Sequence, residues 1–242
     1  MSLMRFNLRY PLIILVSAVL MAWLLSFKPM SDKPKIIYVF DPMCGWCYGF
    51  SKVMDTYADA HKNTFTFNII SGGMVTGDRE GPIGDFADYI LGAYKRVEEY
   101  SGIKFGEPYL AQLRTKKLWS SSVTPAIAIE TFKHFKPDDA IQFASAVQRA
   151  YFYDGKDLRD DSVYRQLIQP YNISESDFFS LMHSEGMRKA ATDGFQESAN
   201  YGITGYPAVL LLYKGKYYMV AKGFTDYDTF SKTIQTVLEK YK

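Results

Sequence analysis

The chain has very little cysteine: Cys44 and Cys47 are the only two among its 242 residues. A zinc site built on Cys-x-x-Cys needs a second group of ligands, and the three histidines, His61, His134 and His183, are too widely spaced to supply one. The sequence therefore predicts no metal site. A structural disulfide or two buried thiols remain the alternatives to a redox-active pair.

The chain also lacks the patterns that indicate nucleotide or nucleic-acid binding. It contains no Gly-x-Gly-x-x-Gly motif, and its net charge is only +2 without a basic block. Nucleic-acid binding is therefore not expected. We expect no cofactor other than a redox-active disulfide between Cys44 and Cys47.

Charge is absent from residues 11–27, which a basic segment with Arg5 and Arg9 precedes. A helix of this length spans roughly 25 Å, at the lower limit for crossing a membrane. The pattern fits a signal anchor or a signal peptide, and no Ala-x-Ala cleavage motif follows. We expect residues 1–27 to form an uncleaved anchor, with a cleaved peptide as the alternative, and residues 28–34 to form a linker.

The two cysteines lie between a strand-like run and a helix-like run. Residues 35–40 are apolar on both faces, which is typical of a central buried strand, and residues 48–61 follow as the predicted helix. Cys44 and Cys47 would lie one turn apart at the helix start, within reach of a disulfide. Because the helix N-terminus favours a thiolate, Cys44 is the expected nucleophile and Cys47 the resolving thiol.

Three segments of the chain resemble one known family. Residues 41–50 read Asp-Pro-Met-Cys-Gly-Trp-Cys-Tyr-Gly-Phe, and residues 202–211 read Gly-Ile-Thr-Gly-Tyr-Pro-Ala-Val-Leu-Leu. With residues 153–158, they resemble the DsbA family of thiol–disulfide oxidoreductases, and especially its FrnE-like, predicted protein-disulfide isomerase branch. The resemblance implies a thioredoxin-like α/β fold with a large helical insertion. The hydrophobic helix expected from residues 11–27 would precede this fold.

The expected domain spans residues 35–242. Apolar residues recur at helical spacing over about 79–201, which predicts the helical insertion there. Pro82 would lie at the start of its first helix, and Asp226 would cap the last helix of the chain. Residues 64–70 would pair beside the first strand in a βαβ unit.

The resemblance also implies a second element of the site. The peptide bond before Pro207 would be cis and would face Cys44. The backbone of Tyr206 would then pair with an extended substrate. The alternative is a proline that opens an edge strand.

Asp41 and Trp46 are further candidates. Asp41 could tune the cysteines or help proton transfer to Cys47, or it could be an Asp-Pro turn residue, which we favour. Trp46 would cover the site and contact substrate, with surface packing as the alternative. Gly45-Trp46 departs from the Pro-His dipeptide of the best-known DsbA proteins, which leaves oxidase, isomerase and reductase activity possible.

We therefore expect an exported, membrane-anchored thiol–disulfide oxidoreductase in the periplasm or cell envelope. It would act on cysteine-containing proteins as an oxidase or isomerase, with an unidentified redox partner, and reach the membrane through residues 11–27. One alternative is a glutathione-linked or isomerase-type relative of the cytosolic branch. Another is a non-catalytic metal chaperone or binding module on a thioredoxin scaffold.

Overall fold

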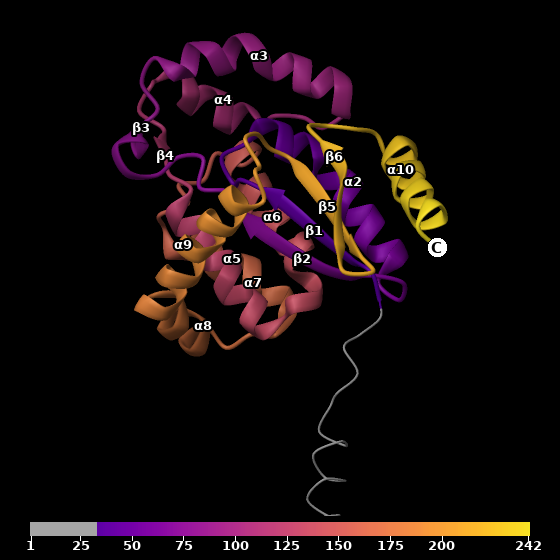
Figure 1. Cartoon of the computed structure of the whole chain (residues 1–242). Coiled ribbons are helices and arrows are strands. Elements are labelled where there is room, and N and C mark those ends of the chain that lie inside the picture. The colour runs from indigo at the N-terminus through magenta and orange to yellow at the C-terminus, as the bar shows by residue number, and fades with distance from the viewer. Residues whose placement is uncertain (1–32) are drawn as a thin grey trace, which may run out of the picture. The chain divides into compact units, whose positions relative to one another are not determined.

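A four-stranded mixed sheet carries the site, and a computed structural model that describes residues 33–242 gives its order as β2-β1-β5-β6 (Figure 1). β1 (Lys35–Phe40) pairs in parallel with β2 (Thr66–Ser71) and antiparallel with β5 (Ala208–Tyr213). β6 (Lys216–Lys222) pairs antiparallel with β5. β1 is therefore a central strand, as predicted, and the arrangement is the expected thioredoxin-like α/β fold.

The expected hydrophobic helix over residues 11–27 lies outside the described residues. Between residues 33 and 242, no helix is both long enough and apolar enough to cross a membrane.

The alternating side chains of β1 enter two separate cores. Ile36, Tyr38 and Phe40 belong to the larger core, which also contains residues of α2 (Gly45–His61) and α10 (Tyr227–Lys240). Ile37 and Val39 point to the other face and pack in a smaller cluster with Ile203 and Leu210. Burial on both faces explains why the sequence of β1 is apolar throughout.

The chain between β2 and β5 forms the large helical insertion. Its α-helices are α3 (Phe86–Ser101), α4 (Glu107–Arg114), α5 (Val123–Phe135), α6 (Ala140–Phe152), α7 (Asp161–Ile168), α8 (Glu175–Met182) and α9 (Glu185–Asn200). In Figure 1, α3 and α4 lie together above the sheet, close to the start of α2. Gly49 allows this approach, because a Cβ there would lie 2.9 Å from the Val97 side chain of α3.

The insertion begins differently from the sequence prediction. Pro82 does not start a helix but lies in β3 (Gly81–Pro82), which pairs antiparallel with β4 (Trp119–Ser120), and α3 begins only at Phe86. The prediction used the preference of proline for a first helical turn, whereas pairing with a distant segment decides the structure here. This two-stranded ribbon, whose strands are separated in sequence by α3 and α4, forms part of the surroundings of the site.

Candidate active site

Cys44 is the N-cap residue of α2, and Cys47 lies in its first turn. The Cys47 backbone N–H donates a hydrogen bond to the Cys44 sulfur at 3.1 Å, because the first amides of a helix have no partner within it. Both residues are free thiols in this structure, with exposed fractions of 6% for Cys44 and 0% for Cys47. The structure therefore brings the two sulfurs together, with Cys44 the more accessible.

The two thiols differ in their electrostatic surroundings. Burial raises the pKa of the Cys47 thiol well above its ordinary value, and the adjacent Cys44 raises it further. A backbone hydrogen bond from Asp41 lowers the pKa but does not offset these effects. Cys47 is therefore held as a neutral thiol near neutral pH, as suits a resolving residue that must not compete with the nucleophile.

The loop before β5 lies against Cys44. The Tyr206–Pro207 peptide bond is cis, as the resemblance implied. The Cys44 thiol donates to the Tyr206 carbonyl oxygen at 3.6 Å, across 162 residues of sequence. This places a backbone acceptor beside the reactive sulfur, where an extended peptide can reach it; substrate pairing there stays a prediction.

The side chain of Tyr206 anchors this loop through its hydroxyl group. Its hydroxyl donates to the Gly72 carbonyl at 2.8 Å and lies 3.3 Å from the Ser198 hydroxyl. A Cβ at position 72 would lie only 2.0 Å from the Tyr206 ring. The absence of a side chain at Gly72 therefore leaves space for the ring.

The Asp41 carboxylate joins the active-site turn to the helical insertion. It is 0% exposed and accepts hydrogen bonds from the backbone N–H of Met43 at 2.8 Å, the hydroxyl of Ser122 at 2.8 Å and the backbone N–H of Met74 at 2.7 Å. Burial raises the pKa of Asp41, although these hydrogen bonds oppose the shift. Asp41 is thus a turn residue, as favoured from the sequence, and also a link between segments; its part in proton transfer stays a prediction.

Ser122 and Gln148 also belong to the site, although neither was predicted from the sequence. Ser122 also accepts from the Val75 N–H at 2.9 Å, and its own N–H donates to the Val75 carbonyl at 2.8 Å. Gln148, 1% exposed, donates from Nε2 to the carbonyl oxygens of Asp41 at 3.1 Å and Cys44 at 3.5 Å. A signal existed for Gln148, because it occupies a position on the apolar stripe of its helix where a polar residue needs a partner.

An apolar cavity of about 420 Å³ extends to the active-site turn at Met43. Met43, the residue before Cys44, forms part of its wall. The other lining residues come from the segment after β2, the β3–β4 ribbon, α3, α4 and α6: Met74, Val75, Arg79, Pro82, Ile83, Phe86, Ile90, Tyr109, Ser120 and Tyr151.

Residues 35–235 match the DSBA-like thioredoxin domain family. The chain belongs to this family. Its membership and the Cys44–Cys47 pair support thiol–disulfide oxidoreductase activity, and DsbA-like proteins act on cysteine-containing substrates.

Solved structures share the fold of this DSBA-like protein. A "putative protein disulfide isomerase" from Nitrosomonas europaea has a TM-score of 0.75 and 23% identity, over 87% of this chain and 100% of that one. The cytosolic disulfide reductase DsbM from Pseudomonas aeruginosa has a TM-score of 0.69 and 21% identity, over 85% and 98%. The same reductase with GSH has a TM-score of 0.68 and 20% identity, over 85% and 99%. No curated protein sequence matches the chain.

Trp46 covers one side of the DSBA-like site. Its ring lies 6.1 Å from the ring of Tyr100 on α3 and 6.1 Å from that of Phe224, and the side chain is partly buried. These contacts are the surface packing that was the alternative for Trp46, and its expected contact with substrate stays a prediction.

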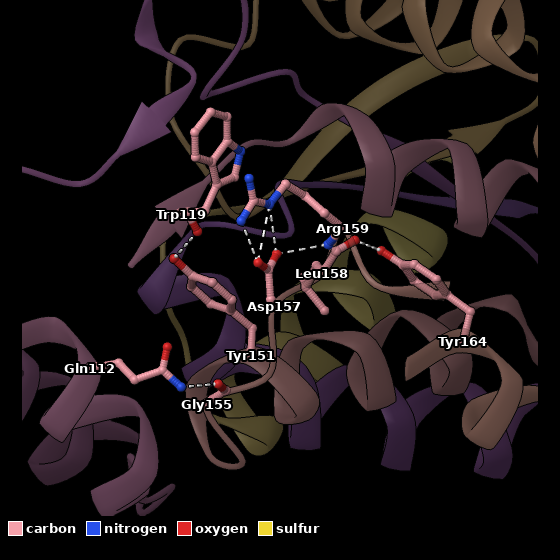
Figure 2. Close-up of polar contacts among 8 residues, drawn as sticks. All are labelled: Gln112, Trp119, Tyr151, Gly155, Asp157, Leu158, Arg159 and Tyr164. Atoms are coloured by element: carbon pink, nitrogen blue, oxygen red, sulfur yellow. Dashed lines mark hydrogen bonds and ion pairs between the residues drawn. The ribbon is translucent and has the colours of Figure 1, made fainter. Parts of the chain in front are cut away.

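A loop after α6 supports the wall on which Tyr151 lies (Figure 2). Arg159 forms an ion pair with Asp157, and its guanidinium carbon lies 4.2 Å from the centre of the Trp119 ring. Tyr151 donates from its hydroxyl to the Trp119 carbonyl at 3.2 Å. β4 therefore contacts both α6 and this loop. The loop contains part of the segment 153–158 that resembled the family.

No group of three or more His, Cys, Asp or Glu residues within the described chain, 33–242, is arranged to hold a metal ion.

Proposed function

We propose that this protein catalyses thiol–disulfide exchange on cysteine-containing proteins, as an oxidase or isomerase in an extracytoplasmic compartment. The observation that carries the proposal is the position of the Cys44 sulfur, which lies between the Cys47 N–H at 3.1 Å and the Tyr206 carbonyl at 3.6 Å. This sulfur is at a helix N-terminus, where a thiolate is stabilised. Its resolving partner is one turn away and fully buried.

In the oxidase direction, a substrate thiolate attacks the Cys44 sulfur of the Cys44–Cys47 disulfide. The bond between the two protein sulfurs breaks, a mixed disulfide forms at Cys44, and Cys47 leaves and takes up a proton. A second substrate thiolate then attacks the substrate sulfur and releases Cys44. Two electrons pass to the protein and one disulfide forms in the substrate. In isomerisation, reduced Cys44 attacks a substrate disulfide and is released again without net electron transfer.

The equilibrium reduction potential of the Cys44–Cys47 pair tests the direction. The donor to the Cys44 sulfur is a neutral backbone amide, so we predict a potential between roughly −270 and −120 mV, the thioredoxin and DsbA values. Equilibration with glutathione buffers, followed by Trp46 fluorescence, gives the value. A potential near the thioredoxin value would argue against an oxidase, and failure to refold scrambled ribonuclease would argue against an isomerase.

The proposed location rests on residues 11–27, whose uncharged apolar sequence favours export. A reporter that is active only outside the cytoplasm should work when fused after Lys242. Activity of a cytoplasm-only reporter at the same position would refute export. N-terminal sequencing of the mature protein distinguishes an anchor from a cleaved peptide.

Glutathione-linked exchange is the second candidate function. The observation that favours it is the similarity in fold to DsbM, which is described as a cytosolic disulfide reductase and was solved with GSH. Reduction of the Cys44–Cys47 disulfide should then saturate with glutathione, whereas a rate that rises linearly at all concentrations would count against a dedicated glutathione site.

A further inference from the structure

The cavity that Met43 lines is large enough to hold part of a ligand. Its volume of about 420 Å³ exceeds that of one amino-acid side chain, and most of its lining residues are apolar. Met43 contributes both to this wall and to the turn that holds Cys44. The cavity therefore extends to the turn that presents Cys44 to a substrate.

Two exposed aromatic residues lie at the start of α3. Phe86, which lines the cavity, is 58% exposed, and Tyr89 is 66% exposed. Their rings stack with centres 5.2 Å apart. Exposed aromatic side chains next to an apolar cavity are typical of a surface that becomes buried on binding.

One cation at this cavity is not engaged by the protein. The Arg79 side chain is exposed, and within residues 33–242 its guanidinium has no hydrogen bond or ion pair. Arg159 instead binds Asp157 and stacks on Trp119 of β4. Arg79 is thus free to bind a carboxylate of a ligand.

We propose that this cavity, with Phe86 and Tyr89 at its edge and Arg79 as its cation, binds polypeptide substrates next to their reacting cysteine. A large apolar side chain would occupy the cavity, and a nearby carboxylate would pair with Arg79. This inference rests on the proposed function. Met43, which lines the cavity, adjoins Cys44 in the chain, and an extended chain advances about 3.3 Å per residue, so the test places the recognised residues within about two positions of the cysteine.

Exchange with short peptides that carry a single cysteine tests the inference. The Cys47→Ser protein is first charged at Cys44 with thionitrobenzoate, whose coloured thiolate is released when a peptide thiolate attacks the Cys44 sulfur. Four peptides place Leu or Ala, combined with Glu or Gln, within two residues of the cysteine. Each rate is divided by the same protein's rate with mercaptoethanol, which removes differences in the reactivity of Cys44 itself.

We expect Leu peptides to react about tenfold faster than Ala peptides, because part of the Leu side chain is buried. Glu peptides should react about two- to fivefold faster than Gln peptides at low salt. The advantage of Glu should disappear at 1 M salt, where charges are screened within about 3 Å.

Two variants assign these preferences to the cavity. Phe86→Ala should remove most of the Leu preference and keep the Glu preference, whereas Arg79→Gln should do the reverse. Tyr217→Ala, an aromatic residue 52% exposed on β6, and Arg188→Gln on α9 are the matched controls and should keep both preferences.

The outcomes separate the inference from the proposed function. Equal normalised rates for all four peptides, with normal release by mercaptoethanol, would overturn the inference alone. Preferences unchanged in both cavity variants would also overturn it. Glutathione reacting faster than every peptide, with Phe86→Ala slowing only glutathione, would assign the cavity to that tripeptide instead. No release by any thiol would overturn the proposed function and the inference together.

Discussion

The two parts of the chain that meet at Cys44 contribute different kinds of chemical group. The thioredoxin-like part surrounds the sulfur with backbone groups, the N–H of Cys47 and the carbonyl of Tyr206. The helical insertion contributes side chains: the hydroxyl of Ser122, the amide of Gln148 and most of the apolar cavity. The comparison suggests that reactivity depends on the backbone, which side-chain substitutions leave in place, whereas choice of substrate depends on side chains of the insertion.

Removing the nucleophile should have the largest effect on the exchange rate, because neither part of the chain can promote exchange without the Cys44 sulfur. Cys44→Ser should lower the rate of disulfide exchange on the order of a thousandfold or more, because the thiolate is the attacking group. Cys47→Ala should instead accumulate mixed disulfides through Cys44, visible on non-reducing gels. Mixed disulfides that form better in Cys44→Ser than in Cys47→Ala would show that the roles are reversed.

Cutting the link between the two parts should have the next largest effect. Asp41→Ala leaves the buried Met43 N–H, the half-buried Met74 N–H and the buried Ser122 hydroxyl without their acceptor. We expect the free energy of unfolding to fall by about 3 kcal/mol, measured by urea denaturation. Asp193→Ala, at an exposed residue that pairs with Lys189, is the matched control and should change stability by about 0.5 kcal/mol or less. Equal losses in the two variants would show that Asp41 is only a local turn residue.

The two thiols of the thioredoxin-like part should differ in how fast they are alkylated. Cys44 is slightly exposed, whereas Cys47 is fully buried and burial raises its pKa. At neutral pH, iodoacetamide should label Cys44 at least about tenfold faster than Cys47, because the thiolate is the reactive form. Mass spectrometry of peptides from briefly treated reduced protein measures this. Faster labelling of Cys47 would contradict its assignment as the resolving thiol.

A second contact between the two parts should give the smallest effect. Ser145 of α6 donates to Asp55 of α2 at 2.7 Å, and burial raises the pKa of Asp55 to about 7. Between about pH 4 and 7 the unfolded chain loses this proton while the folded chain keeps it, so stability falls as the pH rises through that window. Asp55→Asn, which still accepts from Ser145, should raise the free energy of unfolding by about 1 kcal/mol at pH 8, a value reduced for partial exposure.

The control for Asp55 is a neighbour on the same helix. Asp59→Asn changes the same charge at an exposed position whose carboxylate binds Gln142. Urea unfolding at pH 4 and pH 8 compares the variants. The stabilisation from Asp55→Asn should be absent at pH 4, and a benefit that is equal at both pH values would exclude ionisation as its cause.

The parts of the site that lie within short segments could be predicted from the sequence. The strand, the cysteine pair and the helix follow one another within residues 35–61, and the Asp226 cap needs only the Thr229 N–H three residues on, at 2.9 Å. The helix itself starts at Gly45, three residues before the predicted start, because Cys44 serves as its cap.

The remaining features depend on contacts that no local pattern contains. The Asp41–Ser122 hydrogen bond joins residues 81 positions apart. The β3–β4 pairing joins two short segments that α3 and α4 separate in the sequence. Pro82 was misassigned for this reason. The cavity was likewise not predicted, because its walls come from several separate segments that are adjacent only in the folded chain.

The position of β5 also has a consequence for synthesis on the ribosome. β5 lies between β1 and β6 in the sheet, yet the whole helical insertion is translated before it. Tyr206 follows Cys44 by 162 residues, which takes roughly 8–30 s at about 5–20 residues per second. During that interval the nascent chain carries both cysteines without the carbonyl that later faces Cys44. The thiols are therefore present as ordinary nascent-chain cysteines before they are a redox site.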